Sequence, residues 1–130
     1  MKVVDFSPDR ATPIELFGSV RATSVPIGDG SGAVHVYAVR FAPGGSIGRH
    51  EAGFDQLFLV VEGSGWAEGD DGVRVDLPAG RGAFFRKGEV HSKGSAAGLT
   101  AIMVQADRVE PVEDAHGEDP AGGAPAARGG

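Results

Sequence analysis

Residues 56–62, QLFLVVE, contain the longest apolar run in the chain, and this run constrains the fold more than any other feature. Its apolar residues are continuous rather than alternating, which indicates a strand covered on both faces, as in a closed or double-layered sheet. Because successive side chains of a strand point to opposite sides, one face carries Gln56, Phe58 and Val60. If that face lines a barrel, the opposite face needs a cover from N-terminal strands or from another subunit.

Other segments also have the composition of short strands. Residues 33–41, AVHVYAVRF, are dense in β-branched and aromatic residues and predict a strand with His35 and Tyr37 on one face. Residues 99–105 are again apolar on both faces and predict the last strand. About eight to ten short strands, with little sign of helical periodicity, predict an all-β sandwich or barrel.

Glycines are expected to end several of these strands. Glycine accounts for 22 of the 130 residues, about twice its average share. The segments 28–32 (GDGSG) and 63–65 (GSG) are therefore predicted turns. Ahead of them, the apolar residues Val3, Val4 and Phe6 predict a peripheral strand or an extended arm that crosses to a partner subunit.

The length allows one domain, because a single core of this size already buries about two thirds of the unfolded surface. We place this domain at residues 1–112. From 113 to 130 the chain is rich in acidic residues, Pro, Gly and Ala and has few apolar anchors, which predicts a disordered tail.

Charge narrows the range of partners. The formal net charge is -6, from 18 acidic and 12 basic residues, which argues against nucleic acid or an anionic membrane surface. No apolar run approaches the roughly 18 residues of a membrane span, and the N-terminus lacks the apolar core of a signal peptide. We therefore expect a cytoplasmic protein whose partners are a small-molecule ligand and a second copy of the chain in a homodimer.

Two glycine-bracketed stretches, 44–63 and 80–95, carry residues at fixed spacings. They resemble the two motifs of the cupins, G-x5-H-x-H-x3-E-x6-G and G-x5-P-x-G-x2-H-x3-N, and the spacings match without insertion. The resemblance covers roughly residues 33–106 and implies a single-domain jelly-roll β-barrel, or double-stranded β-helix. The matched positions are Gly44, His50, Ala52, Gln56 and Gly63 in the first motif, and Gly80, Arg86, Gly88, His91 and Ser95 in the second.

In metal-binding cupins the two histidines and the glutamate of the first motif, with the histidine of the second, hold one divalent ion. The resemblance therefore implies that His50, Gln56 and His91 bind a metal such as Fe, Mn, Ni, Cu or Zn. Here Ala52 replaces one histidine and Gln56 replaces the glutamate, so two imidazoles and one uncharged amide remain. Such a site needs water or an anion to complete it, and we expect weak binding at low occupancy.

Other interpretations of these residues stay open. The two histidines also fit partly buried imidazoles that hydrogen-bond to the backbone or to Gln56. Among nearby carboxylates, Glu89 is the better substitute for the missing ligand, because strand alternation points Glu51 away from His50.

Four further residues are candidates for ligand contact. His35 and Tyr37 face the barrel mouth in one strand parity and are otherwise half-exposed strand residues. Arg86 lies next to the mouth, where a guanidinium binds a carboxylate or phosphate, although a solvated turn accounts for it as well. Phe58 lines the ligand site or belongs to the core.

Two functions of different kinds are consistent with these features. The first is a small-molecule pocket with a weakly held metal, for which the resemblance implies oxygenase, isomerase or lyase chemistry. The second is a non-catalytic binding or sensing module that has lost its metal and holds an organic ligand through His50 and His91. A third hypothesis is a dimerisation scaffold whose barrel interior is filled and has no cavity.

Overall fold

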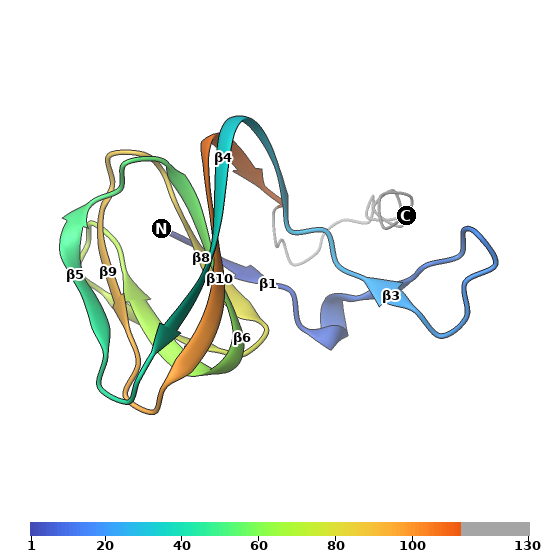
Figure 1. The fold of residues 1–130 in the computed structure, drawn as a ribbon, viewed down its shortest axis with the longest axis horizontal. Coiled ribbons are helices and arrows are strands. Elements are labelled where there is room, and N and C mark those ends of the chain that lie inside the picture. Colours follow the sequence, from blue (N-terminus) through green and yellow to red (C-terminus); the bar gives the residue numbers. More distant parts are fainter. Residues whose placement is uncertain (113–130) are drawn as a thin grey trace.

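The computed structural model describes residues 1–112, which form ten antiparallel strands and one turn of 3-10 helix, η1 (Pro8–Arg10) (Figure 1). The predicted all-β barrel is confirmed, while the predicted disordered tail at 113–130 lies outside the described residues. No helix within residues 1–112 is long and apolar enough to cross a membrane. The strands are β1 (Lys2–Asp5), β2 (Thr12–Pro13), β3 (Thr23–Ser24), β4 (Gly28–Phe41), β5 (Ser46–Glu51), β6 (Asp55–Glu68), β7 (Arg74–Pro78), β8 (Arg81–Phe85), β9 (Val90–Gly94) and β10 (Leu99–Pro111).

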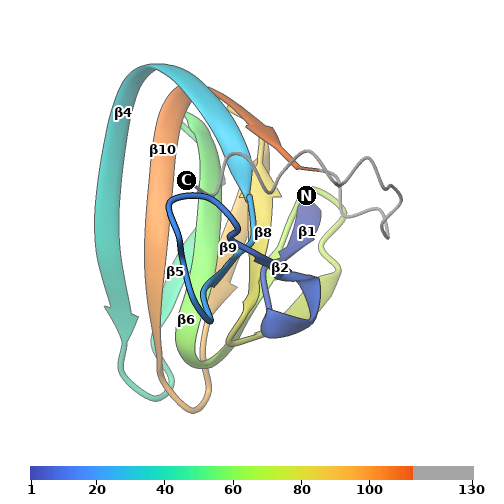
Figure 2. The same ribbon diagram turned by 90° about the vertical axis from the view of Figure 1, so that its right-hand side faces the viewer.

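Two layers of strands form the barrel, and the long strand β6 belongs to both. Its first half pairs with β8 and β10, giving a first sheet in the order β1, β8, β6, β10, β4 (Figure 2). Its second half pairs with β7 and β9, and β9 pairs with β5 to complete a second sheet. The short strands β2 and β3 form a separate hairpin beside the barrel (Figure 1).

Strand β6 passes from one sheet to the other at Gly63, so the predicted turn at 63–65 is wrong. Gly63 has a φ of +77°, and a Cβ there would lie 2.2 Å from the carbonyl oxygen of Gly98. Glycine alone tolerates both the left-handed conformation and this close backbone approach. The strand therefore bends at this residue instead of ending.

The predicted turn at 28–32 is also wrong, because β4 begins at Gly28. This glycine-rich segment pairs with residues 108–111, which carries both β4 and β10 beyond their predicted limits. A Cβ on Gly28 would lie 2.9 Å from the carbonyl oxygen of Glu110. Here glycine allows two backbones to approach closely within a sheet.

One apolar cluster lies in the interior between the sheets. Phe58 is fully buried, and its ring stacks on that of Phe41 at a centroid separation of 6.2 Å. Strand alternation thus places Phe58 and Val60 inside, as the sequence predicted. The buried members are Phe58, Val60, Ala67, Leu77, Ala83, Phe85, Leu99 and Ala101.

A second apolar cluster covers the opposite face of the first sheet. Strand β1 pairs with β8 of its own chain, so residues 2–5 form the predicted peripheral strand rather than a crossing arm. The buried members are Val4, Leu57, Leu59, Phe84, Ala106 and Val109.

Leu57 and Leu59, which point to the outer face of the first sheet, are therefore covered by residues of the same chain. No second subunit is needed to bury them. The homodimer stays a prediction. Edge strand β4, which among the strands of residues 1–112 pairs with β10 alone, exposes Val34 and Val36. Phe17 and Val20, between β2 and β3, and Val61 of β6 are exposed as well.

Candidate functional site

One row of side chains crosses the inner face of the first sheet. The strand register aligns His35 of β4 with Gln105 of β10, Gln105 with Gln56 of β6, and Gln56 with Phe85 of β8. Directly opposed residues of antiparallel strands share a face. Because Phe85 belongs to the interior cluster, this row faces the barrel interior.

The second sheet places two imidazoles against each other. His50 of β5 and His91 of β9 are register partners, and their Nε2 atoms lie 3.3 Å apart. The Nδ1 atom of His50 lies 2.7 Å from the carbonyl oxygen of Gly48. Since a carbonyl only accepts, His50 carries a hydrogen on Nδ1. In the neutral pair, His91 therefore donates its Nε2 hydrogen to His50.

His91 is the buried member of this pair, whereas His50 is exposed. Burial, together with the charges of Lys93 and His50, lowers the pKa of His91 to about 3. Its ring packs edge-on against Phe85 at a centroid distance of 4.3 Å. Among residues 1–112, its buried Nδ1 atom has no hydrogen-bond partner. His91 is therefore a neutral imidazole with one open acceptor inside the barrel.

This shift predicts a pH-dependent stability. The unfolded histidine takes up its proton near pH 6.5 and the folded one only near pH 3, so the unfolded state holds more protons between these values. We expect the free energy of unfolding to fall by about 2 kcal/mol between about pH 6.5 and 4.5, measured by urea denaturation. The fall should vanish in His91→Asn and persist in His35→Asn, and an equal fall in both variants would contradict this assignment.

Gln56 is a buried amide on the same interior face, 3% exposed. Its Oε1 atom is buried and has no hydrogen-bond partner in the described part of the chain. Gln56 is the register partner of Phe85, whose ring also contacts His91. Gln56 and His91, which carry the two open acceptors, therefore both adjoin Phe85.

Lys93 is an interior residue that the sequence analysis missed. It follows His91 by two positions on β9, so the two side chains share a face. Its side chain is 1% exposed, and its Nζ lies 5.3 Å from the ring centroid of Phe58 and 5.2 Å from that of Phe85. Burial lowers the pKa of Lys93 to about 8. At neutral pH the barrel interior thus holds a cation.

The donor set does not fit a resident divalent metal. The spacing of the two histidines is suitable, because nitrogens bound at about 2.0 to 2.1 Å to one tetrahedral ion lie about 3.3 Å apart. However, His50, His91 and Gln56 are all uncharged donors, and the ammonium of Lys93 adds a positive charge beside them. Metal-bound histidines also normally donate their second nitrogen to a neighbour, and His91 has no such partner. Within residues 1–112, no cluster of three or more His, Cys, Asp or Glu side chains could hold a metal ion.

The substitute ligand considered from sequence, Glu89, has other partners. One carboxylate oxygen pairs with the α-ammonium of Met1, and the other accepts the backbone N–H of Arg86 at 3.2 Å. Ala52, which replaces the second histidine of the motif, is buried at 3% exposure and offers no donor. The site therefore keeps only the three uncharged donors.

The four predicted ligand contacts occupy different surroundings. Phe58 is a core residue whose ring also faces Lys93. His35 and Tyr37 are exposed, although register places them on the inner face of β4 beside Gln105 and Met103. The inner face of this edge strand is thus open to solvent.

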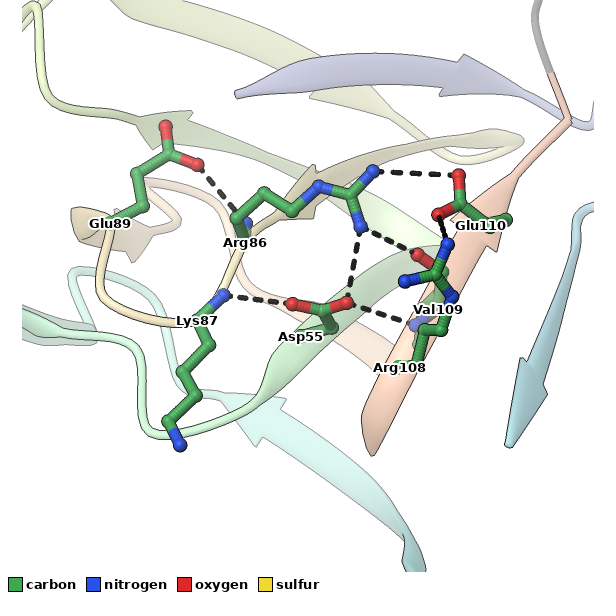
Figure 3. Close-up of polar contacts among 7 residues, drawn as sticks. All are labelled: Asp55, Arg86, Lys87, Glu89, Arg108, Val109 and Glu110. Carbon is green, nitrogen blue, oxygen red and sulfur yellow. Dashed lines mark hydrogen bonds and ion pairs between the residues drawn. The ribbon is translucent and has the colours of Figure 1, made fainter. Parts of the chain in front are cut away.

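Arg86 lies in a polar network at the start of β6 (Figure 3). Its guanidinium binds Asp55 at 3.2 Å, the carbonyl oxygen of Val109 at 3.0 Å and Glu110 at 3.4 Å. The Asp55 carboxylate also accepts the backbone N–H groups of Lys87 and Val109, each at 2.9 Å. The contact of Arg86 with a ligand stays a prediction, and its charge already has partners within the chain.

Comparison with known proteins by sequence gives no match. No family model matches this chain, and no curated protein matches it.

Solved structures do match. A conserved protein of unknown function from Streptococcus pyogenes aligns over 58% of this chain and 65% of its own, with 16% identity and a TM-score of 0.54. A cupin-like protein from Thermotoga maritima aligns over 61% of this chain and 64% of its own, with 22% identity and a TM-score of 0.54. The chain thus spans slightly less than two thirds of these two structures.

A third structure is similar over more of this chain. A cupin superfamily protein from Desulfitobacterium hafniense aligns over 83% of this chain and 100% of its own, with 17% identity and a TM-score of 0.55. At these identities the likeness concerns the fold, which agrees with the two-sheet barrel and the motif spacing described above. The chain therefore has the jelly-roll fold of the cupin superfamily.

Proposed function

We propose that the barrel binds a small organic molecule at His50, His91 and Gln56 without a resident metal, as a binding or sensing module. The observation that carries this proposal is the pair of buried, unpartnered acceptors, Nδ1 of His91 and Oε1 of Gln56. Buried polar groups are normally hydrogen-bonded, and leaving one unpaired costs about 1 to 3 kcal/mol. A ligand with hydrogen-bond donors would satisfy both.

Exposure of the surrounding residues supports access to these groups. His50 is exposed while its register partner His91 is buried, so the pair spans the boundary between solvent and interior. His35 and Tyr37 are exposed on the inner face of β4. We therefore place the entry of the ligand on the side of these exposed residues.

A second candidate is the metal-dependent one, with oxygenase, isomerase or lyase chemistry. The 3.3 Å separation of the two Nε2 atoms favours it, because this is the spacing of two ligands on one tetrahedral ion. The uncharged donor set and the neighbouring ammonium count against it. Metal binding is therefore the alternative that the experiment must distinguish from metal-free ligand binding.

Titration separates the two candidates. Protein purified without an affinity tag would be stripped with a chelator and titrated with Mn, Fe, Co, Ni, Cu and Zn salts, and separately screened by thermal shift against a panel of small metabolites. We expect no metal to bind below about 100 μM, and panel members to stabilise the wild type but not the His50→Ala, His91→Ala double variant. His35→Ala is the matched single-histidine control.

Stoichiometric metal binding that is lost in the double variant and retained in His35→Ala would overturn the metal-free proposal. Stabilisation by panel members that is unchanged in the double variant would move the ligand site away from the histidine pair.

A further inference from the structure

Lys93 has an unusual position for a lysine. It projects from the penultimate residue of β9 into the barrel interior, where only 1% of its surface is exposed. Its Nζ lies over the faces of two phenyl rings, those of Phe58 and Phe85. Aromatic faces attract a cation, but more weakly than an anion does.

No carboxylate balances this charge. Within residues 1–112, no hydrogen bond or ion pair joins the side chain of Lys93 to another residue, although its strand pairs with β5 and β6. Two acidic residues of the adjoining segments have other partners: Glu68 binds Arg74 and Ser92, and Glu89 binds Met1. Glu51, on the paired strand β5, is exposed. A buried charge in a folded protein is normally paired. The barrel interior therefore has an unbalanced positive charge.

Lys93 and the two residues with open acceptors all adjoin Phe85. The ring of Phe85 contacts His91 at 4.3 Å and Lys93 at 5.2 Å, and its register partner is Gln56. The three groups thus present one cation and two hydrogen-bond acceptors around a single apolar ring. The complementary molecule is small, carries one anionic group and has a hydroxyl or amino donor.

We infer that Lys93 is the anion-recognition residue of this barrel and that the ligand is a small carboxylic acid bearing a hydroxyl group. The inference rests on the binding function proposed above. One ammonium matches the single charge of a carboxylate. A phosphate usually takes several donors, such as arginine or backbone N–H groups at a helix terminus, and Arg86, the nearest arginine in sequence, is already bound to Asp55.

A purely structural role does not explain why a lysine occupies position 93. A methionine fills the same elongated volume without a charge, and buried charges replaced by apolar residues of similar size often leave a protein equally or more stable. Lys93 makes no ion pair that such a replacement would break. Its amine is therefore the part that needs a functional explanation.

Acid and amide pairs provide the test. Acetate, glycolate and lactate would be titrated into the wild-type protein by NMR, each beside its neutral primary amide as a control of the same shape. We expect each acid to bind at least ten times more tightly than its amide, with glycolate and lactate tighter than acetate. Lys93→Met should weaken acid binding at least tenfold and leave amide binding unchanged, while Lys87→Met, at an exposed lysine, should change neither.

Equal affinity for acid and amide in the wild type would overturn the role of Lys93, and this comparison needs no variant to fold. Equal acid binding by wild type and Lys93→Met would do the same. If the acids bind and the His50→Ala, His91→Ala double variant binds them equally well, the proposed function fails while the role of Lys93 stands. If none of the acids binds at 20 mM, the inference about the ligand class is overturned. The proposed function is then still tested by the thermal-shift screen of metabolites.

Discussion

Replacing Asp55 with alanine is expected to lower the free energy of unfolding by about 3 to 5 kcal/mol, because the change removes a buried anion that holds three partners. Asp55 is 6% exposed. Its carboxylate accepts hydrogen bonds from the Arg86 guanidinium and from the backbone N–H groups of Lys87 and Val109. It thereby ties the start of β6 to the β8–β9 loop and to the end of β10 (Figure 3). Burial alone would raise the pKa of Asp55, but these N–H groups and Arg86 outweigh it and lower the pKa.

Asp107→Ala is the matched control. This aspartate also accepts one backbone N–H, that of Ala33 at 2.9 Å, but it is exposed. We expect a loss of about 1 kcal/mol or less, since water replaces an exposed hydrogen bond. Both variants would be measured by urea denaturation at pH 7. Similar losses for the two variants would show that burial of the Asp55 network contributes little.

Much of the fold was predictable because short-range patterns and motif spacing agree. The continuous apolar run of β6 indicated a strand covered on both faces, and the two clusters on either side of Phe58 and Leu57 confirm it. The prediction that glycines end the strands was wrong at two places. Gly63 and Gly28 are required by close approach of a second backbone, which depends on residues distant in sequence.

The candidate site was predictable only in part. Motif spacing indicated that His50 and His91 belong to one site, and the register places them opposite each other. The partners of Glu89 were not predictable, because the pairing with Met1 joins residues 88 positions apart. Lys93 was missed because lysine in a glycine-rich segment is normally solvent-exposed. Strand alternation from His91 was the available signal, and it points Lys93 inward.

Lys93→Met is expected to stabilise the ligand-free protein by about 3 kcal/mol at pH 7. The pKa of Lys93 falls from 10.5 to about 8 on folding, and each pKa unit corresponds to about 1.4 kcal/mol. Because the folded state holds this proton less tightly than the unfolded state, the cost is fully present below about pH 8. It decreases as the pH rises toward 10.5 and disappears above that value. A residue that lowers the stability of the free protein fits a binding role.

We propose that a ligand, and not a metal, balances the cation inside the barrel. The most direct measurement is the urea unfolding free energy of wild type and Lys93→Met at pH 7, both free of ligand and metal, repeated at rising pH. The account predicts that Lys93→Met is the more stable protein at pH 7 and that wild type approaches it between pH 8 and 10.5. A variant less stable than wild type at pH 7, with a difference independent of pH, would contradict it.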